Sequence, residues 1–461
     1  MTPVTCFAGH KVALFGLGGS GLVTARALVA GGAHVAAWDD NAKARDKALE
    51  AGLTLVDLTT ADWSAFDALV LAPGVPLTHP TPHWTVEKAK AAEVEIIGDI
   101  ELFCRERATI APSSLFVAIT GTNGKSTTTA LIAHLLKVTG HKVCLGGNIG
   151  VPILALDPPA DGRIHVIECS SFQIDLAPTL APSVGIVLNV TPDHLDRHGT
   201  MENYAAIKER LIAGAEFSVI GDDDEYCRAM HRRREGPAVA ISGASAIDGI
   251  YVQPGSRLVE RRSGDVVTTL ADLTGIRSLR GAHNGQNAAA AVAAVSPFNI
   301  PAKVLQQGLA SFPGLPHRME EVGRLGKVLF INDSKATNAD ATEKALLSFE
   351  DMFWIIGGKA KEGGIEPLRP LFHKVRKAYL IGASSVDFAA TLGSAVVFDH
   401  CGTLDVAIEH AARDAAQSDA KEPAVLLSPA CASYDQFPNF EVRGDHFRHL
   451  ARALIARVDE P

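Results

Sequence analysis

The chain has few of the features that mark secreted, membrane-spanning or nucleic-acid-binding proteins. No apolar run approaches the roughly twenty residues that cross a bilayer, and the N-terminal stretch lacks a charged start followed by an apolar signal core. The net charge is −9 and no long basic run offsets it, which argues against a nucleic-acid partner. The seven cysteines form no C-x-x-C pair, so reduced thiols suit them better than a disulfide framework. We therefore expect a soluble cytoplasmic protein.

What is present is an ordinary globular composition on a long chain. The 461 residues are 47% hydrophobic and 21% charged, and a chain of this length exceeds one hydrophobic core. Strand and helix patterns alternate at both ends, whereas short alternating runs between about 240 and 275 indicate hairpins. Prolines and glycines cluster at Pro313–Arg318, which favours a hinge there. We expect three α/β domains, spanning 1–108, 109–313 and 314–461, the central one with a mainly parallel sheet plus a small antiparallel sheet.

The most informative segment is ITGTNGKSTT, from Ile119 to Thr128. An apolar run that predicts a buried strand precedes it, and a helical pattern ending at Gly140 follows it. Backbone N–H groups and the positive helix end would face phosphates, with Lys125 reaching the terminal phosphates and Ser126 available to Mg²⁺. The loop is shorter than G-x-x-x-x-G-K-[ST], because Gly121 lies three residues before Gly124. This pattern predicts ATP binding.

A second glycine motif, GLGGSG from Gly16 to Gly21, follows the first expected strand. With Asp39 and Asp40 about twenty residues on, it matches the dinucleotide fingerprint. The loop senses a pyrophosphate and not a nicotinamide, so a nucleotide diphosphate sugar would suit it as well as NAD. The motif alone does not choose between these ligands.

Polar residues follow two central strands. Glu168 lies near the end of one, where α/β sheets place ligands, and a carboxylate is a ligand that Mg²⁺ prefers. His194 follows the other, but histidine is a less usual ligand for Mg²⁺, and Lys208 alone reads as a surface lysine. Arg318, Lys335 and Lys361 are cations at expected loops and strand ends of the last domain, where a dicarboxylate or the phosphates of ATP would need them.

These segments together carry a resemblance to the Mur ligases, over essentially the whole chain. ITGTNGKSTT is common to the Mur ligases and the folylpolyglutamate synthases. The closer similarity, to the members that add D-glutamate, lies in GGNIG, ECSSFQ, NVTPDHLDRH, HNGQN, GLPHRME, NDSKATN and SPACASYDQFPNFEVRG.

The resemblance implies an N-terminal Rossmann-like domain for the UDP end of the substrate, a central P-loop ATPase and a C-terminal Rossmann-like domain that closes over the site. ATP would phosphorylate the alanyl carboxylate of UDP-MurNAc-L-Ala, and D-glutamate would then attack the acyl phosphate to give the amide, ADP and phosphate, in peptidoglycan precursor synthesis. Positioning and charge neutralisation would dominate such catalysis. The resemblance further implies a monomer that uses two Mg²⁺ sites and does not use NAD.

It also implies roles for individual residues. Lys125, Glu168, His194 and Lys208 would be catalytic. Ser126 and Glu168 would hold one Mg²⁺ and His194 a second, assisted by Lys208 after carbamylation by CO₂. The implied nucleotide contacts are Gly121, Thr122, Asn123, Gly124, Lys125, Ser126, Thr127, Asn284, Arg318 and Asp333. The implied substrate contacts are Gly18, Ser20, Asn148, Ser170, Lys335, Thr337, Lys361, Ser433 and Phe440.

The chain departs from the family at two positions, and three other functions are compatible with parts of it. Asp39-Asp40-Asn41 replaces a threonine and arginine near the uridine, and Lys359 replaces an acidic residue. An NAD-dependent oxidoreductase would account for GLGGSG but not for the phosphate loop. A folylpolyglutamate-type ligase would leave NDSKATN and SPACASYDQF unexplained, and a P-loop regulatory ATPase would need no D-glutamate.

Overall fold

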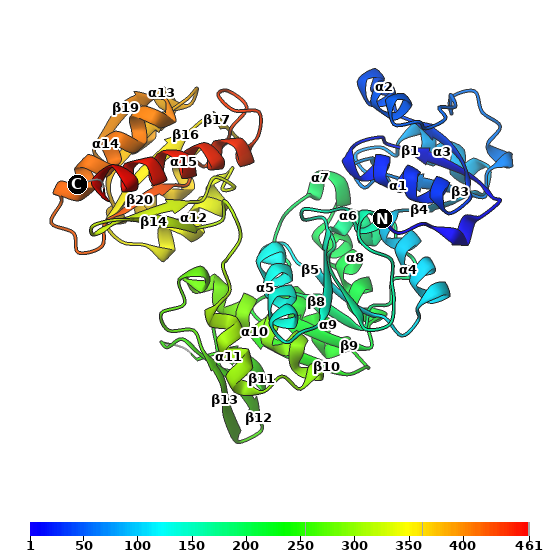
Figure 1. Cartoon of the computed structure of the whole chain (residues 1–461), viewed down its shortest axis with the longest axis horizontal. Coiled ribbons are helices and arrows are strands. Elements are labelled where there is room, and N and C mark those ends of the chain that lie inside the picture. The colour runs from blue at the N-terminus through cyan, green and yellow to red at the C-terminus, as the bar shows by residue number, and fades with distance from the viewer. Residues whose placement is uncertain (254, 362, 460–461) are drawn as a thin grey trace. The chain divides into compact units, whose positions relative to one another are not determined.

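The computed structural model describes residues 1–253, 255–361 and 363–459 (Figure 1). Within it the chain forms two compact units. Unit 1 comprises Met1–Thr274 and Gly285–Ser311, and unit 2 comprises Gly275–Asn284 and the chain from Phe312 onward. The polypeptide therefore crosses between the units more than once.

Unit 1 begins with a four-stranded parallel sheet in the order β2-β1-β3-β4. Its strands are β1 (Lys11–Phe15), β2 (His34–Trp38), β3 (Ala68–Leu71) and β4 (Glu95–Ile97). The helices of this part are α1 (Gly19–Ala30), α2 (Ala42–Glu50), α3 (Trp84–Ala91) and α4 (Asp99–Ile110). The glycine motif follows β1, as its sequence predicts, and runs into the first turn of α1.

The larger sheet of unit 1 has nine strands in the order β13-β12-β11-β10-β9-β8-β5-β7-β6. Its strands are β5 (Leu115–Thr120), β6 (Lys142–Gly147), β7 (Arg163–Glu168), β8 (Val184–Val187), β9 (Phe217–Gly221), β10 (Ala238–Ser242), β11 (Gly249–Val252), β12 (Leu258–Ser263) and β13 (Val266–Asp272). The accompanying helices are α5 (Lys125–Val138), α6 (Ser171–Asp175), α7 (Leu195–His198), α8 (Met201–Ala213), α9 (Glu225–Arg233), α10 (His283–Val295) and α11 (Ala302–Ala310). Strands β5 to β11 pair in parallel, so the carboxyl ends of β5, β6, β7 and β8 lie along one edge.

The expectation of a separate small antiparallel sheet is wrong. Strands β11, β12 and β13 do pair as antiparallel hairpins, but β11 also pairs in parallel with β10, through Ile241↔Ile250 and Ser242↔Tyr251. The open edge of β10 thereby gains a hydrogen-bonding partner, and the hairpins extend the main sheet.

Unit 2 is built on a six-stranded sheet in the order β14-β15-β20-β16-β18-β19, in which only β14 is antiparallel to its neighbour. The strands are β14 (Glu320–Leu325), β15 (Val328–Asn332), β16 (Met352–Gly357), β18 (Val375–Ile381), β19 (Phe398–Gly402) and β20 (Ala424–Leu427), beside a two-stranded pair of β17 (Lys359–Ala360) and β21 (Cys431–Ala432). The helices are α12 (Ala339–Ser348), α13 (Ser385–Leu392), α14 (Leu404–Gln417) and α15 (Phe440–Asp459). Alternate residues of β16 enter two separate apolar clusters, so both faces of this sheet are covered.

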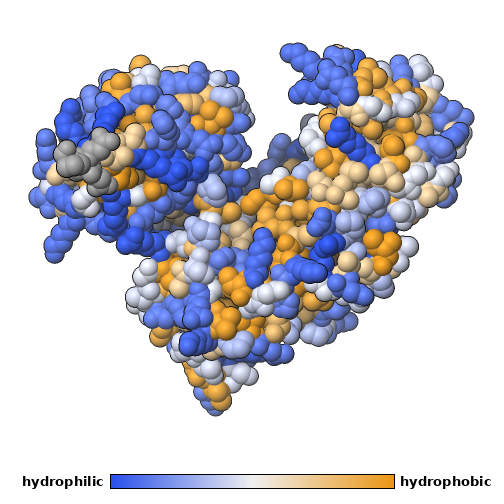
Figure 2. Space-filling view, in the orientation of Figure 1, coloured by the Kyte–Doolittle hydropathy of each residue, from blue (hydrophilic) through white to orange (hydrophobic). Residues whose placement is uncertain are grey.

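No helix in the described part of the chain combines the length and the apolar character needed to cross a bilayer. On the face shown in Figure 2, hydrophilic side chains are interspersed with hydrophobic ones over both units.

Candidate active site

The phosphate loop occupies the sharp connection between β5 and α5. The strand ends at Thr120 and the helix begins at Lys125, immediately after Gly124. Gly124 has φ +84°, and a Cβ there would lie 2.3 Å from Oδ1 of Asn287. Only glycine fits this position, because the left-handed backbone and the close side chain both exclude a Cβ. The first N–H groups of α5 therefore face the space above the strand ends.

The loop is braced by residues from two other segments. Thr122 Oγ1 donates to the carbonyl of Thr191 and accepts from its N–H, at 3.1 and 3.0 Å. The N–H of Asn123 donates to Oδ1 of Asn189 at 2.8 Å, and Asn189 Nδ2 donates to Oε1 of Gln286 at 2.9 Å. These bonds hold the loop in one conformation before any ligand arrives. The segments NVTPDH and HNGQN thus contribute Asn189 and Gln286, two residues that the sequence did not single out.

Two lysines converge on the backbone of this loop. Lys125 Nζ donates to the carbonyls of Gly121 and Thr122 at 3.0 and 2.8 Å. Lys208 Nζ, from α8, donates to the carbonyl of Gly121 at 2.9 Å and to Oγ1 of Thr120 at 3.2 Å. Lys208 is 1% exposed, so it is not the surface lysine that its helix alone suggests. Burial, and secondly the positive charge of Lys125, lower the pKa of the Lys208 ammonium well below its usual value.

Glu168 ends β7, next to Ile119 of β5 and Gly147 of β6. The side chain is 2% exposed. Its Oε1 accepts from Nδ2 of Asn148 at 2.9 Å, while the buried Oε2 accepts no hydrogen bond from the described residues. A buried carboxylate oxygen without a hydrogen bond is costly, and a bound cation would offset that cost, so Glu168 is suited to hold one.

His194 is the least constrained of the expected catalytic residues. It precedes α7 in a left-handed conformation, φ +53°, and its side chain is 49% exposed. Its Nε2 lies 3.3 Å from Oδ2 of Asp193, and its ring packs beside Phe172. No hydrogen bond between described residues joins His194 to Glu168 or Lys208. No group of three His, Cys, Asp or Glu side chains in the described ranges forms a ready metal cluster.

The glycine motif forms a tight turn with an open outer side. A Cβ on Gly16, which has φ +97°, would lie 2.5 Å from Cβ of Ala72, and a Cβ on Gly21 would lie 1.8 Å from the carbonyl oxygen of Gly16. A Cβ on Gly18 would meet nothing within 4 Å. Gly18 precedes α1 and Ser20 lies in its first turn, so the helix N-terminus faces this open side.

The acidic pair after β2 is engaged within the protein. Asp39 Oδ2 accepts from the N–H of Leu17 at 2.6 Å, which ties this loop to the glycine turn. Asp40 Oδ2 lies 3.2 Å from Nε2 of His83 and accepts from Nε1 of Trp84 at 3.3 Å.

In unit 2, Arg318 and Asp333 lie close together through the backbone. Arg318 stands between His317 and Met319, both with positive φ. Asp333 Oδ1 accepts from the N–H of Met319 at 3.1 Å, and its Oδ2 accepts from Oγ of Ser428 at 2.7 Å. Burial raises the pKa of Asp333 to about 7. Asn284, at the start of α10, donates from Nδ2 to the carbonyl of Arg280.

The remaining expected residues of unit 2 lie on several segments, and a contact joins two of them. Lys335 Nζ lies 4.9 Å from the centre of the Phe440 ring. Lys361 directly follows β17 and Ser433 directly follows β21, and because Lys359↔Ala432 and Ala360↔Cys431 pair in antiparallel fashion, these two residues leave the pair at opposite ends. Thr337 lies two residues after Lys335, immediately before Asn338, which caps α12. Lys359 itself is a partner in the β17–β21 pair and lies exposed.

The family model and the curated relatives that match this chain all describe Mur ligases. A family model described as the Mur ligase middle domain matches residues 119–295. A UDP-N-acetylmuramoylalanine–D-glutamate ligase of Mesorhizobium japonicum is 58% identical over 457 residues, covering 98% of each chain. A ligase of the same description from Nitrobacter hamburgensis is 59% identical over 461 residues, again covering 98% of each.

Solved structures with a similar fold are more distant in sequence. The UDP-N-acetylmuramate-alanine ligase MurC of Thermotoga maritima has a TM-score of 0.57 at 18% identity, covering 96% of this chain and 99% of its own. The MurF ligase of the same organism, in complex with ADP, has a TM-score of 0.56 at 18% identity, covering 85% of this chain and 90% of its own. At that identity the similarity concerns the fold alone.

Proposed function

The chain belongs to the Mur ligase family, and from that premise we propose that it joins D-glutamate to UDP-N-acetylmuramoyl-L-alanine while ATP is cleaved to ADP and phosphate. The product is a peptidoglycan precursor. The observation that carries this proposal is the convergence of Lys125, Lys208 and Glu168 at neighbouring strand ends around one phosphate loop.

The donor set of unit 1 fits Mg²⁺. Glu168 has a buried oxygen without a hydrogen bond, and Ser126 lies in the first turn of α5. Mg²⁺ usually takes one or two protein oxygens and completes its shell with water and substrate phosphates, so the absence of a preformed three-residue cluster among the described residues suits it. When bound, Mg²⁺ would neutralise the phosphate oxygens and align them. Ser126 and Glu168 would hold one ion, and His194 would hold a second.

The protein's own residues would act mainly by position and charge. The N–H groups of the loop and the ammonium of Lys125 would hold the β- and γ-phosphates, so that the γ-phosphorus faces the alanyl carboxylate. Asn148 and Ser170 would fix that carboxyl group. The carboxylate oxygen would bond to phosphorus as the bond to ADP breaks. The amine of D-glutamate would then attack the acyl carbon, lose a proton and expel phosphate.

Lys208 would carry a carbamate in the active protein. Carbamylation requires a neutral amine, and the buried position beside Lys125 lowers the pKa of Lys208 accordingly. The N–C bond forms from the amine and CO₂, a proton is released, and the side chain becomes an anion that can assist a metal.

The other expected residues complete a three-domain enzyme. Residues 1–108 would hold the UDP end through Gly18 and Ser20, and 109–313 would bind ATP, with Asn284 as a further nucleotide contact. Residues 314–461 would close over the site as a Rossmann-like domain. There Arg318 and Asp333 would contact the nucleotide, while Lys335, Thr337, Lys361, Ser433 and Phe440 would form the D-glutamate pocket. We place this reaction, by a monomer, in the cytoplasm, where ATP is available.

A coupled assay tests the function directly. Phosphate release should require UDP-MurNAc-L-Ala, ATP, Mg²⁺ and D-glutamate together, and L-glutamate should not replace the D-isomer. Phosphate release without D-glutamate would favour a regulatory ATPase instead. Release with a folate acceptor in place of the UDP substrate would favour a folylpolyglutamate-type ligase.

A further inference from the structure

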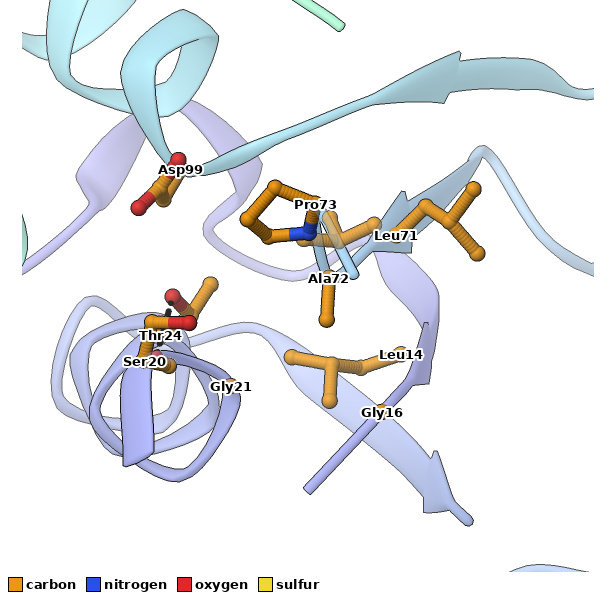
Figure 3. A pocket seen from close by; sticks show the side chains of 10 residues that line it. Leu14, Gly16, Ser20, Gly21, Thr24, Leu71, Ala72, Pro73 and Asp99 are labelled. Atoms are coloured by element: carbon orange, nitrogen blue, oxygen red, sulfur yellow. Dashed lines mark hydrogen bonds between the residues drawn. The ribbon is translucent and has the colours of Figure 1, made fainter. Parts of the chain in front are cut away.

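Asp99 is a buried carboxyl group that the proposed reaction does not use. It is the first residue of α4, lies 5% exposed, and lines a small pocket beneath the glycine turn together with Gly16, Ser20, Gly21 and Thr24. Figure 3 shows its carboxylate at the start of α4, facing the turn of α1 that carries Ser20 and Thr24. Such a group needs hydrogen-bond donors, because burial penalises an unpaired carboxylate.

The side-chain donor comes from α6. Gln173 Nε2 donates to Oδ1 and Oδ2 of Asp99, at 3.3 and 3.2 Å, and the N–H of Ile100 donates to Oδ1 at 2.9 Å. The amide group of Gln173 is thereby oriented with its nitrogen toward Asp99 and its oxygen away from it.

That oxygen holds Ser170. Gln173 Oε1 accepts from both the N–H and the Oγ–H of Ser170, each at 3.2 Å, and Ser170 Oγ accepts from the N–H of Gln173 at 3.2 Å. A serine hydroxyl has one hydrogen and two lone pairs. Its hydrogen is committed to Gln173, so Ser170 can offer only an acceptor to a ligand.

We propose that Asp99 is a positioning residue for the acyl substrate: it fixes Gln173 so that Ser170 presents a hydrogen-bond acceptor to an N–H group of that substrate. The relay connects the glycine turn, where the diphosphate end would bind, with the serine that would hold the acyl end. It rests on the proposed function only for the identity of the substrate.

The donor and acceptor pattern suggests a sharp test. Asp99→Asn places an amide N–H opposite the side-chain N–H of Gln173. This favours rotation of the Gln173 amide by 180°, which turns its nitrogen instead of its oxygen toward Ser170. Adding Gln173→Glu exchanges the two groups, so that a donor again faces an acceptor and a carboxylate oxygen again faces both Ser170 hydrogens. The double variant keeps the net charge of the wild type.

Glu101→Gln is the matched control. Glu101 is also buried in α4, and it accepts from the N–H and Oγ1 of Thr179, at 2.9 and 2.8 Å, without reaching Ser170. Its loss should lower the melting temperature and leave the KM values unchanged.

The experiment compares KM for each substrate, with calorimetric binding of UDP-MurNAc-L-Ala measured in parallel. Asp99→Asn should raise KM for the UDP substrate about tenfold, as one mispaired hydrogen bond predicts. KM for ATP and D-glutamate should stay constant, and the double variant should return the first KM to within about twofold of wild type.

Three results would overturn the relay. The first is that Asp99→Asn lowers the melting temperature but leaves KM for the UDP substrate unchanged, as the control does. The second is that the double variant folds but keeps the raised KM. The third is that the double variant does not fold. If Asp99→Asn alone does not fold, the KM of the double variant decides. A wild type that binds the UDP substrate but makes no product with D-glutamate would refute the ligase function, while the calorimetry would still judge the relay.

Discussion

Replacing Glu168 by glutamine should separate stability from activity. The wild-type side chain is 2% exposed, with one oxygen bonded to Asn148 and the other without a partner among the described residues. Glutamine keeps the shape and can keep the bond to Asn148, while it removes the buried charge.

The magnitude follows from the cost of that lone oxygen. A buried polar atom without a partner costs about 1–3 kcal/mol, and more when the group is charged. The new amide N–H also lacks a partner, but it is neutral. We therefore expect the ligand-free variant to be more stable than the wild type, with a free energy of unfolding about 1–2 kcal/mol higher. With Mg²⁺ and ADP the order should reverse. Ligand at a hundred times Kd stabilises the wild type by about 2.7 kcal/mol, whereas the variant should lose the Mg²⁺-dependent part of this gain.

Urea denaturation with and without Mg²⁺ and ADP measures both effects, and D-glutamate-dependent phosphate release should fall by at least about 100-fold. Glu101→Gln is again the control, since its hydrogen-bonded carboxylate stabilises the fold and that variant should unfold more easily with its Mg²⁺ response intact. A Glu168→Gln protein that is less stable than wild type without ligand, or that keeps the full Mg²⁺ response, would refute the reasoning.

Three further predictions follow from the geometry. Gly16→Ala should lower the free energy of unfolding in urea by about 1–3 kcal/mol, because φ is +97° and the new Cβ would lie 2.5 Å from Cβ of Ala72. Gly18→Ala should fold normally and mainly raise KM for the UDP substrate. Equal destabilisation by the two substitutions would contradict this prediction. Asp333 should make stability depend on pH: between its ordinary value of 3.8 and its folded pKa of about 7 only the folded state holds the proton, so stability should fall as pH rises through that window and level off above it. Asp333→Asn should flatten this slope in unfolding curves at pH 5 and pH 8, and an unchanged slope would assign it to another group. Lys208→Ala should lose at least about 100-fold in activity and recover part of it with formate or acetate, whereas Lys125→Ala should not recover; a fully active Lys208→Ala would remove the carbamate from the mechanism.

Local chemistry made the phosphate loop predictable. The apolar run before it, Gly124 and the helical pattern after it each constrain a few neighbouring residues, and the helix does begin at Lys125 and end near Gly140. The same holds for the glycine motif that follows β1. These signals depend on residues that are close together in the sequence, so they can be recognised from the sequence alone.

Contacts between distant segments were not predictable in this way. Gln173 meets Asp99 across 74 residues of sequence, and nothing in ECSSFQ or GDIELF announces the pair. The apolar run AVVF, residues 395–398, has the composition of a strand, but β19 begins only at Phe398, because pairing with Ala378 of β18 sets the register and leaves Val397 exposed. The burial of Lys208 likewise depends on the packing of α8 against the main sheet.

The braces on the phosphate loop affect how fast and how selectively a nucleotide can bind. Because Thr191, Asn189 and Gln286 already hold the loop, little backbone freedom is lost when a triphosphate docks. The main rearrangement is that Lys125 exchanges two carbonyl partners for phosphate oxygens. A ligand without phosphates offers no oxygens to replace those two carbonyls as acceptors for Lys125. The loop should therefore add nothing to the affinity for adenosine alone.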